Sequence, residues 1–118
     1  MVKNPHLIMG LSTSARSGLH GLSKALSREV AQYNITINNV LPERIDTDRQ
    51  TQILNFQAKL ADSTYDEAKK ELEETLTAKR MGTVEEFSGI CTFLCSEQAA
   101  YISGQNISVD GGNSTNLI

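Results

Sequence analysis

Each strand predicted by this sequence is separated from the next by at least one helix, and this order constrains the fold most. Candidate strands are the apolar run Leu7–Met9, the β-branched run Ile35–Leu41, which Pro42 follows, and Asn106–Val109, which ends at Asp110–Gly112. Helices between strands are typical of parallel sheets, because parallel neighbours need a crossover connection. Only three strands would leave an unpaired sheet edge. The order therefore predicts an α/β fold that is part of a larger sheet or is completed by a second copy.

The clearest helical pattern covers Ser12–Tyr33, and Asn34 suits its end. Residues three or four apart form one apolar stripe, which consists of Leu19, Leu22, Leu26 and Val30. Small residues form a second line beside it, which consists of Ala15, Gly18, Gly21 and Ala25. Because small side chains allow close approach, we expect this helix to contact a sheet on one side and another helix on the other.

The stretch Asp48–Ala78 is polar and carries two weaker helical patterns. The apolar positions of the first are Ile53, Phe56 and Leu60. The second begins at a capping box formed by Thr64 and Glu67, and its apolar positions are Ala68, Leu72 and Leu76. These narrow stripes predict a surface excursion that could cover a site. A further capping box, Thr83–Glu86, opens a last helix with apolar residues Val84, Phe87, Ile90, Cys91 and Leu94.

Composition excludes several classes of protein. The chain has 118 residues, a net charge of −3 and scattered basic residues, which argues against nucleic acid as a partner. No apolar run approaches the roughly 20 residues of a membrane span. The start Met1–His6 lacks the apolar core of an export signal, so we expect a cytoplasmic protein.

The two cysteines, Cys91 and Cys95, share one helical face, where a metal pair is conceivable. The histidines His6 and His20 are far from them in sequence, and there is no second cysteine pair. The sequence therefore favours two reduced cysteines packed in the core, and no metal.

Four segments in register resemble a known family: Ser14–Glu29, Ile35–Pro42, Arg80–Glu86 and Ile102–Gly112. Together they are similar to the carboxyl-terminal part of short-chain dehydrogenases/reductases, and most of all to the 3-oxoacyl-(acyl-carrier-protein) reductase-like branch. The resemblance spans nearly the whole chain. It implies that residues 1–118 form the carboxyl-terminal half of a Rossmann-type parallel sheet with flanking helices.

The resemblance implies two candidate catalytic positions. The family's Tyr-x-x-x-Lys motif, in which Tyr transfers a proton while Lys binds the nicotinamide ribose and lowers the Tyr pKa, corresponds here to Ser12 and Arg16. A serine hydroxyl is far less acidic than a phenol, but a guanidinium has donors enough for ribose hydroxyls. The alternative is structural, with Ser12 as a helix cap and Arg16 as a solvated or salt-bridged cation.

The resemblance also implies cofactor-binding residues in the segment Pro42–Thr47, which is similar to the family's Pro-Gly-x-Ile-x-Thr motif at the nicotinamide carboxamide. Pro42, Ile45 and Thr47 match, and Glu43 replaces the Gly, which matters if the backbone there needs a positive φ. Thr47 could instead cap the next helix. We expect His20 to serve in packing, and Asp110–Gly112 to form a turn that in the family lies near the active-site mouth.

No set of three among the eight glycines makes the Gly-x-Gly-x-x-Gly phosphate turn, which the resemblance places, with the catalytic Ser strand, before Val2. The intact family uses NAD or NADP, but we expect this chain alone to bind no dinucleotide and to be inactive. A natural short protein, a disrupted gene and a proteolytic remnant all remain open.

Two functional hypotheses follow from the resemblance. In the first, the chain is a fragment of an NAD(P)-dependent oxidoreductase that transfers hydride to a carbonyl substrate, for example a 3-oxoacyl thioester. In the second, it is a non-catalytic assembly module that forms a homo-dimer or tetramer through Ser12–Tyr33 and Thr83–Val109, the elements that build the family's subunit interfaces.

Overall fold

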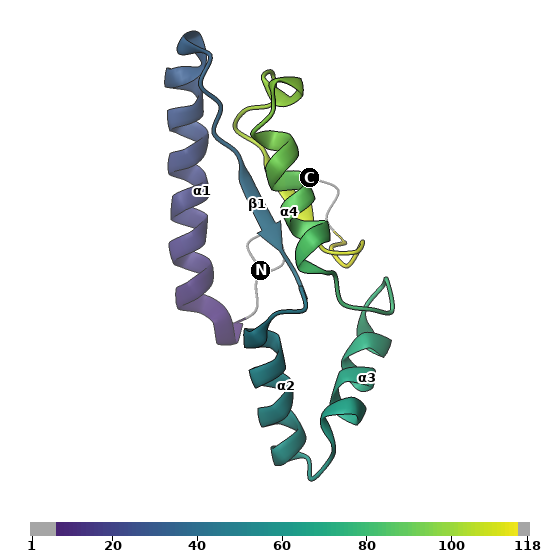
Figure 1. The fold of residues 1–118 in the computed structure, drawn as a ribbon. Helices are drawn as coiled ribbons and strands as arrows, with labels where there is room; N and C mark the ends of the chain where they lie inside the picture. Colours follow the sequence, from purple (N-terminus) through teal and green to yellow (C-terminus); the bar gives the residue numbers. More distant parts are fainter. Residues whose placement is uncertain (1–6, 116–118) are drawn as a thin grey trace.

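A parallel pair of short strands forms the centre of the computed structural model, which describes residues 7–115. Strand β1 (Asn39–Pro42) pairs with β2 (Asn106–Val109) in a register that runs from Asn39 opposite Asn106 to Pro42 opposite Val109 (Figure 1). The predicted α/β class and parallel pairing are confirmed, and β2 has the predicted bounds.

Strand β1 begins later than the sequence predicts. Ile35–Asn38, which is expected to be part of the strand, forms no strand pairing. It instead makes hydrogen bonds to the loop that precedes β2. The Ile37 carbonyl accepts from Gly104 N–H at 2.7 Å, and the Asn38 side-chain amide donates to the Ile102 carbonyl at 2.7 Å. Pro42 lies inside β1 rather than after it. The extent of the strand is determined by its pairing with β2 and not by the strand propensity of its side chains.

The predicted first strand is wrong. Leu7–Met9 forms a 3₁₀ turn, η1, which leads directly into the long helix, and Leu7 is 98% exposed. A strand needs a neighbour to pair its backbone groups. Within residues 7–115 only β1 and β2 form a sheet, so this run satisfies its backbone by continuing into the helix.

Helix α1 (Gly10–Val30) continues as the 3₁₀ turn η2 (Ala31–Tyr33) and stops at Asn34, which takes a left-handed φ of 58°. These bounds confirm the predicted helix and its end. The face that it buries is small and polar: Ser23 and Ser27 are 8% and 3% exposed. The predicted apolar stripe lies elsewhere on the helix and is largely open, with Leu22 64% exposed.

A close approach at Gly104 fixes α1 to the segment that precedes β2. Lys24 Nζ donates to the Gly104 carbonyl at 3.1 Å, and Ser27 Oγ donates to the Lys24 carbonyl at 2.8 Å. Gly104 has a φ of +69°, and a Cβ there would lie 2.6 Å from Ser27 Oγ. Only glycine provides both the left-handed backbone and the space for this contact.

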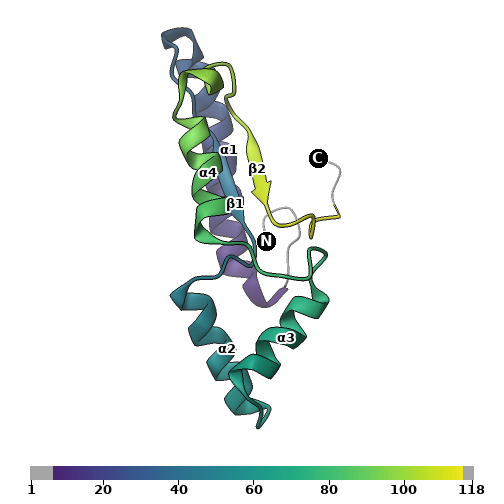
Figure 2. The ribbon, with the colours of Figure 1, turned by 45° about the vertical axis from the view of Figure 1, so that its right-hand side comes forward.

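Helix α4 (Val84–Leu94) covers the sheet from the side opposite to α1, and Figures 1 and 2 show β1 between the two helices. It opens at the predicted capping box of Thr83 and Glu86, and the turn η3 (Glu97–Ala99) follows it. The two helices therefore form the outer layers of a three-layer arrangement around the strand pair.

Helices α2 (Asp48–Leu60) and α3 (Tyr65–Thr75) project beyond the carboxyl ends of the strands (Figure 1). The helix pair encloses a buried apolar cluster of Leu54, Leu76 and Met81, which Tyr65, Ala68 and Leu72 surround.

The stripe predicted for α2 is also wrong. Its buried residues are Gln50, Leu54 and Ala58, while Phe56 and Leu60 are exposed. Helix α3 packs against α2, and the row of residues four apart that contains Leu54 is the buried one. The apolar side chains of α2 alone do not indicate this row.

We predict that Gly104→Ala lowers the free energy of unfolding by about 1–3 kcal/mol, because alanine would be strained at positive φ and would clash with α1. Gly89→Ala, in α4 with nothing within 4 Å of the added Cβ, is the matched control and should stabilise by about 0.5–1 kcal/mol. Urea unfolding followed by circular dichroism measures both. Equal stability of the two variants would contradict the docking at Gly104.

Candidate functional site

The segment that leaves β1, Pro42–Thr47, is held firmly at the carboxyl ends of the two strands. Glu43 N–H donates to the Val109 carbonyl at 3.1 Å and extends the ladder by one bond. Asp46 N–H donates to the Gly82 carbonyl at 2.8 Å, and Gly82 N–H donates to the Arg44 carbonyl at 3.0 Å. The backbone of this segment is therefore fixed to β2 on one side and to the residues before α4 on the other.

The residue that replaces the family's glycine carries no backbone strain. Within this segment the positive φ, 53°, falls at Arg44, one residue after Glu43. The Glu43 carboxylate accepts from Asn113 Nδ2 at 2.8 Å and so turns toward the loop after β2. The Glu43 side chain is therefore accommodated by a hydrogen bond from Asn113.

A pocket of about 180 Å³ lies at the same end of the strands. Its lining combines the segment after β1 with the loops before α4 and after β2, and includes Ile45, Gly82, Val109 and Gly111. Charged side chains also border it, among them Glu43, Arg44, Arg80, Glu86 and Asp110. In open parallel sheets, ligands bind beyond the carboxyl ends of the strands.

Thr47 caps α2, as the structural alternative predicts. Its side-chain oxygen accepts from Gln50 N–H at 3.4 Å. Lys69 of α3 forms an ion pair with Asp46 at 3.5 Å, and the Asp46 charge raises the pKa of Lys69. The end of this segment is thus tied to both helices of the projecting pair.

Ser12 and Arg16 lie one turn apart on α1 and contact each other. Arg16 Nη1 donates to the Ser12 carbonyl at 3.3 Å and also bonds Ser12 Oγ. The predicted cap role for Ser12 is wrong, because Met9 is the N-cap and makes no side-chain cap bond. Arg16 is exposed. Both views show α1 starting just beyond the carboxyl end of β1 (Figures 1 and 2).

Three partly or wholly buried side chains on α1 and α2 have a polar atom without a hydrogen bond: Thr13, His20 and Gln50. His20 is half-buried on α1, and its Nδ1 has no partner. Gln50, 8% exposed at the start of α2, has an unpartnered Nε2. Sequence analysis gave no sign of Gln50, because a glutamine in a polar helical turn is ordinarily exposed.

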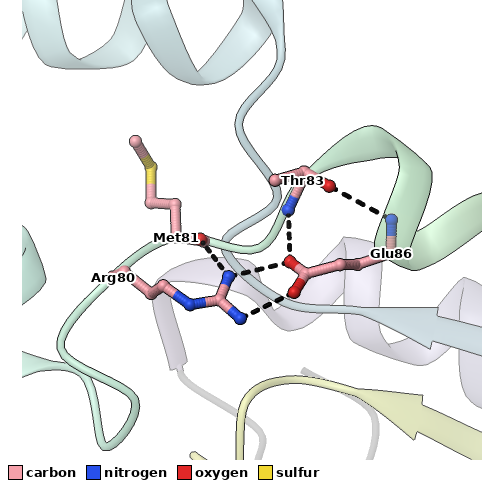
Figure 3. Close-up of polar contacts among 4 residues, drawn as sticks. All are labelled: Arg80, Met81, Thr83 and Glu86. Atoms are coloured by element: carbon pink, nitrogen blue, oxygen red, sulfur yellow. Dashed lines mark hydrogen bonds and ion pairs between the residues drawn. The ribbon is translucent and has the colours of Figure 1, made fainter.

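Arg80 is a second residue that sequence analysis missed. Its Nη1 donates to Glu86 Oε2 at 2.8 Å and its Nη2 to Glu86 Oε1 at 2.6 Å, while Thr83 N–H donates to the same carboxylate at 2.8 Å (Figure 3). The hydrogen bonds from Arg80, and then from Thr83, lower the pKa of Glu86 to about 2. A basic residue close before a capping box was the available signal.

The remaining sequence predictions have mixed outcomes. Asp110–Gly112 forms the expected turn, with Gly112 N–H donating to Asp110 Oδ1 at 3.0 Å. Both cysteines are free, but Cys95 is exposed rather than packed in the core. Within residues 7–115 no group of three or more His, Cys, Asp or Glu residues could hold a metal ion.

In the same range no helix combines the length and hydropathy that crossing a membrane requires. Met1–His6, on which the expectation about export rested, lies outside the described residues.

Comparison with known proteins identifies the family. The sequence profile of the family described as enoyl-(acyl carrier protein) reductase, a branch of the short-chain dehydrogenases/reductases, matches residues 6–114. The chain belongs to the short-chain dehydrogenase/reductase family. Its fold is the Rossmann-type α/β arrangement of that family.

Individual relatives support this assignment. The chain is 35% identical over 111 residues to the NADPH-dependent reductase BacG of Bacillus subtilis, covering 94% of this chain and 43% of BacG. It is 39% identical over 99 residues to a 3-oxoacyl-[acyl-carrier-protein] reductase FabG of Chlamydia muridarum, covering 84% of this chain and 36% of the relative.

Among solved structures, YwfH, an NADPH dependent reductase involved in bacilysin biosynthesis, superimposes with a TM-score of 0.87 at 34% identity, covering 98% of this chain and 44% of YwfH. The chain therefore spans less than half the length of each of these relatives.

We predict that the Arg80–Glu86 pair stabilises the chain in a pH-dependent way. The pKa of Glu86 falls from 4.5 to about 2, so the stabilisation is complete above pH 4.5 and is lost as the pH falls through about 2. Glu86→Gln keeps a capping-box acceptor but removes the charge. Wild type should be slightly more stable than this variant at neutral pH, and most of the difference should be gone near pH 2. A difference in urea midpoints that does not change with pH would contradict the assignment.

Proposed function

We propose that this chain is the nicotinamide-side part of an NAD(P)-dependent oxidoreductase that transfers hydride to a carbonyl substrate. The observation that carries the proposal is the position of Pro42–Thr47. This segment has the sequence expected beside a nicotinamide and lies beyond the carboxyl ends of two parallel strands, where ligands bind in such sheets. Membership of a family of reductases supports it.

The side chains present fit one half of the cofactor. Arg16 is exposed and has guanidinium donors beyond those used on Ser12, which suits ribose hydroxyls. Thr47 accepts a backbone bond as a cap, and its hydroxyl proton can still be donated to a carboxamide. Pro42 and Ile45 supply apolar surface beside them. The eight glycines offer no phosphate turn for the pyrophosphate.

The chemistry divides between the cofactor and the chain. When bound, the nicotinamide supplies the hydride, while the chain must orient the carbonyl and manage its proton. Ser12, in contact with Arg16, can hydrogen-bond a carbonyl oxygen but is a poor proton donor at neutral pH, because an aliphatic hydroxyl is far less acidic than a phenol. Ser12 and Arg16 therefore act in binding and orientation.

We extend the proposal to a 3-oxoacyl thioester as the substrate and to the cytoplasm as the location. The 3-oxoacyl-[acyl-carrier-protein] reductases among the relatives support this substrate class. The free cysteines Cys91 and Cys95 fit a reducing compartment.

The test is a fusion that joins the amino-terminal half of BacG to this chain and is assayed for NADPH oxidation with carbonyl substrates. We predict slow turnover that the double substitution Ser12→Tyr/Arg16→Lys raises by about 10²-fold or more, because it supplies a phenol and the lysine that lowers its pKa.

Ser14→Tyr/Arg28→Lys, on the same helix, is the matched control and should leave the rate unchanged. A fusion that binds NADPH but whose rate does not respond to the Ser12→Tyr/Arg16→Lys change would contradict the proposed place of Ser12 and Arg16 at the reacting carbonyl.

A second candidate function, assembly of identical chains, is favoured by the open face of α1. Leu11, Leu19, Leu22 and Leu26 are 92%, 57%, 64% and 45% exposed and lie at helical spacing. An apolar row of this kind is typical of a surface that another helix covers. In the family, this helix builds a subunit interface.

Sedimentation tests the assembly function. Wild type at roughly 100 µM should sediment as a dimer or larger species, and Leu22→Glu should give a monomer, because a buried unpaired charge is costly. Leu60→Glu, at an exposed leucine of α2, is the control and should sediment like wild type. A folded wild-type monomer at this concentration would exclude the assembly function.

A further inference from the structure

Asn113 contacts both of the segments that border the proposed cofactor site. Its Nδ2 donates to Glu43 Oε1 at 2.8 Å, at the exit of β1. Its Oδ1 accepts from Thr77 N–H at 3.4 Å and from Thr77 Oγ1 at 3.5 Å, in the loop after α3. One side chain of the loop after β2 therefore connects the exit of β1 with the projecting helix pair.

We propose that Asn113 is a positioning residue that holds the Glu43 carboxylate and thereby fixes the segment Pro42–Thr47. The assignment of that segment to the cofactor rests on the proposed function. The clamp, by which we mean the hydrogen bonds of Asn113 to Glu43 and Thr77, does not rest on it. Glu43 stands where the family motif has glycine, and Asn113 supplies the partner that this extra carboxylate needs. The two residues form a matched pair.

The loop that presents Asn113 is itself well fixed. Asp110 accepts backbone bonds from Gly112 at 3.0 Å and from Ser114 at 3.1 Å, and its carbonyl accepts from Asn113 N–H at 3.1 Å. Gly111, with a φ of +60°, approaches so closely that a Cβ there would lie 2.9 Å from the Ala78 Cβ. The turn therefore presses against the loop after α3 and leaves the Asn113 side chain little freedom.

The chemistry of the clamp requires an amide at position 113. An Asn side chain offers a donor and an acceptor together, and here the donor goes to a carboxylate while the acceptor goes to Thr77. An Asp at this position would accept from Thr77 but would set a second negative charge against Glu43. Arg44 and Arg80 border the same pocket, but Arg80 is already paired with Glu86. Asp110 adds a further negative charge, so much of that repulsion would remain.

Hydrogen exchange measured by mass spectrometry on the full 118-residue chain tests the proposal without any cofactor. The informative amides are those of Glu43, Asp46 and Gly82, which hold the segment in place. Asn113→Asp should raise exchange about 10-fold in peptides that cover residues 43–47 and 76–82, while α1 and α4 stay as in wild type. Glu43→Gln keeps an acceptor for Asn113 and should exchange like wild type.

The decisive variant exchanges donor and acceptor. In Glu43→Gln/Asn113→Asp, the Gln amide can donate to the Asp carboxylate, which still accepts from Thr77, so protection should return to the wild-type level. Unchanged exchange in Asn113→Asp, no recovery in the double variant, or a rise spread equally over α1 and α4 would each overturn the proposal. Because no cofactor is present, these outcomes are independent of whether the BacG fusion oxidises NADPH.

Discussion

The parallel pairing of β1 with β2 is the interaction on which the rest of the structure depends. Because the strands run the same way, both of their exits meet at one end, and the segments that follow Pro42 and Val109 lie side by side. The Glu43 bond to the Val109 carbonyl extends the pairing into the site. The pocket, the Pro42–Thr47 segment and the clamp at Asn113 all follow from that common end.

Two strands alone do not make a self-sufficient core. Isolated strand pairs are marginally stable, and the residues of this pair are half-buried or exposed. The cluster of buried apolar residues lies elsewhere and consists of Leu54, Leu76 and Met81 at the projecting helix pair. The sheet is instead secured from one side by the Gly104 contact with α1. This distribution fits a chain that covers 43% of BacG and 44% of YwfH.

Local signals predicted the parts of the fold that local chemistry determines. The capping boxes at Thr64 and Thr83, the end of α1 at Asn34 and the strand Asn106–Val109 lie where the sequence placed them, because each depends on residues close in the chain. What failed depended on partners distant in sequence. Leu7–Met9 has no strand beside it, and the buried row of α2 is chosen by α3 rather than by its own most apolar residues.

The candidate site divides in the same way. Contact between Ser12 and Arg16 follows from their spacing on one helix, and the cap at Thr47 follows from its place before α2. The partner of Glu43 lies 70 residues along the chain, and no local pattern connects the two. The positive φ predicted as a concern at Glu43 falls at Arg44, because backbone conformation at a turn depends on the bonds on both sides of it.

We propose that these residues carry the nicotinamide side of a reductase but no cradle for the pyrophosphate. Calorimetric titration of NADPH into the purified 118-residue chain tests it most directly. We expect no saturable heat up to about 1 mM cofactor, because side chains that contact only the nicotinamide half cannot offset the cost of immobilising the whole dinucleotide. Saturable binding with a Kd near 1 µM would contradict it.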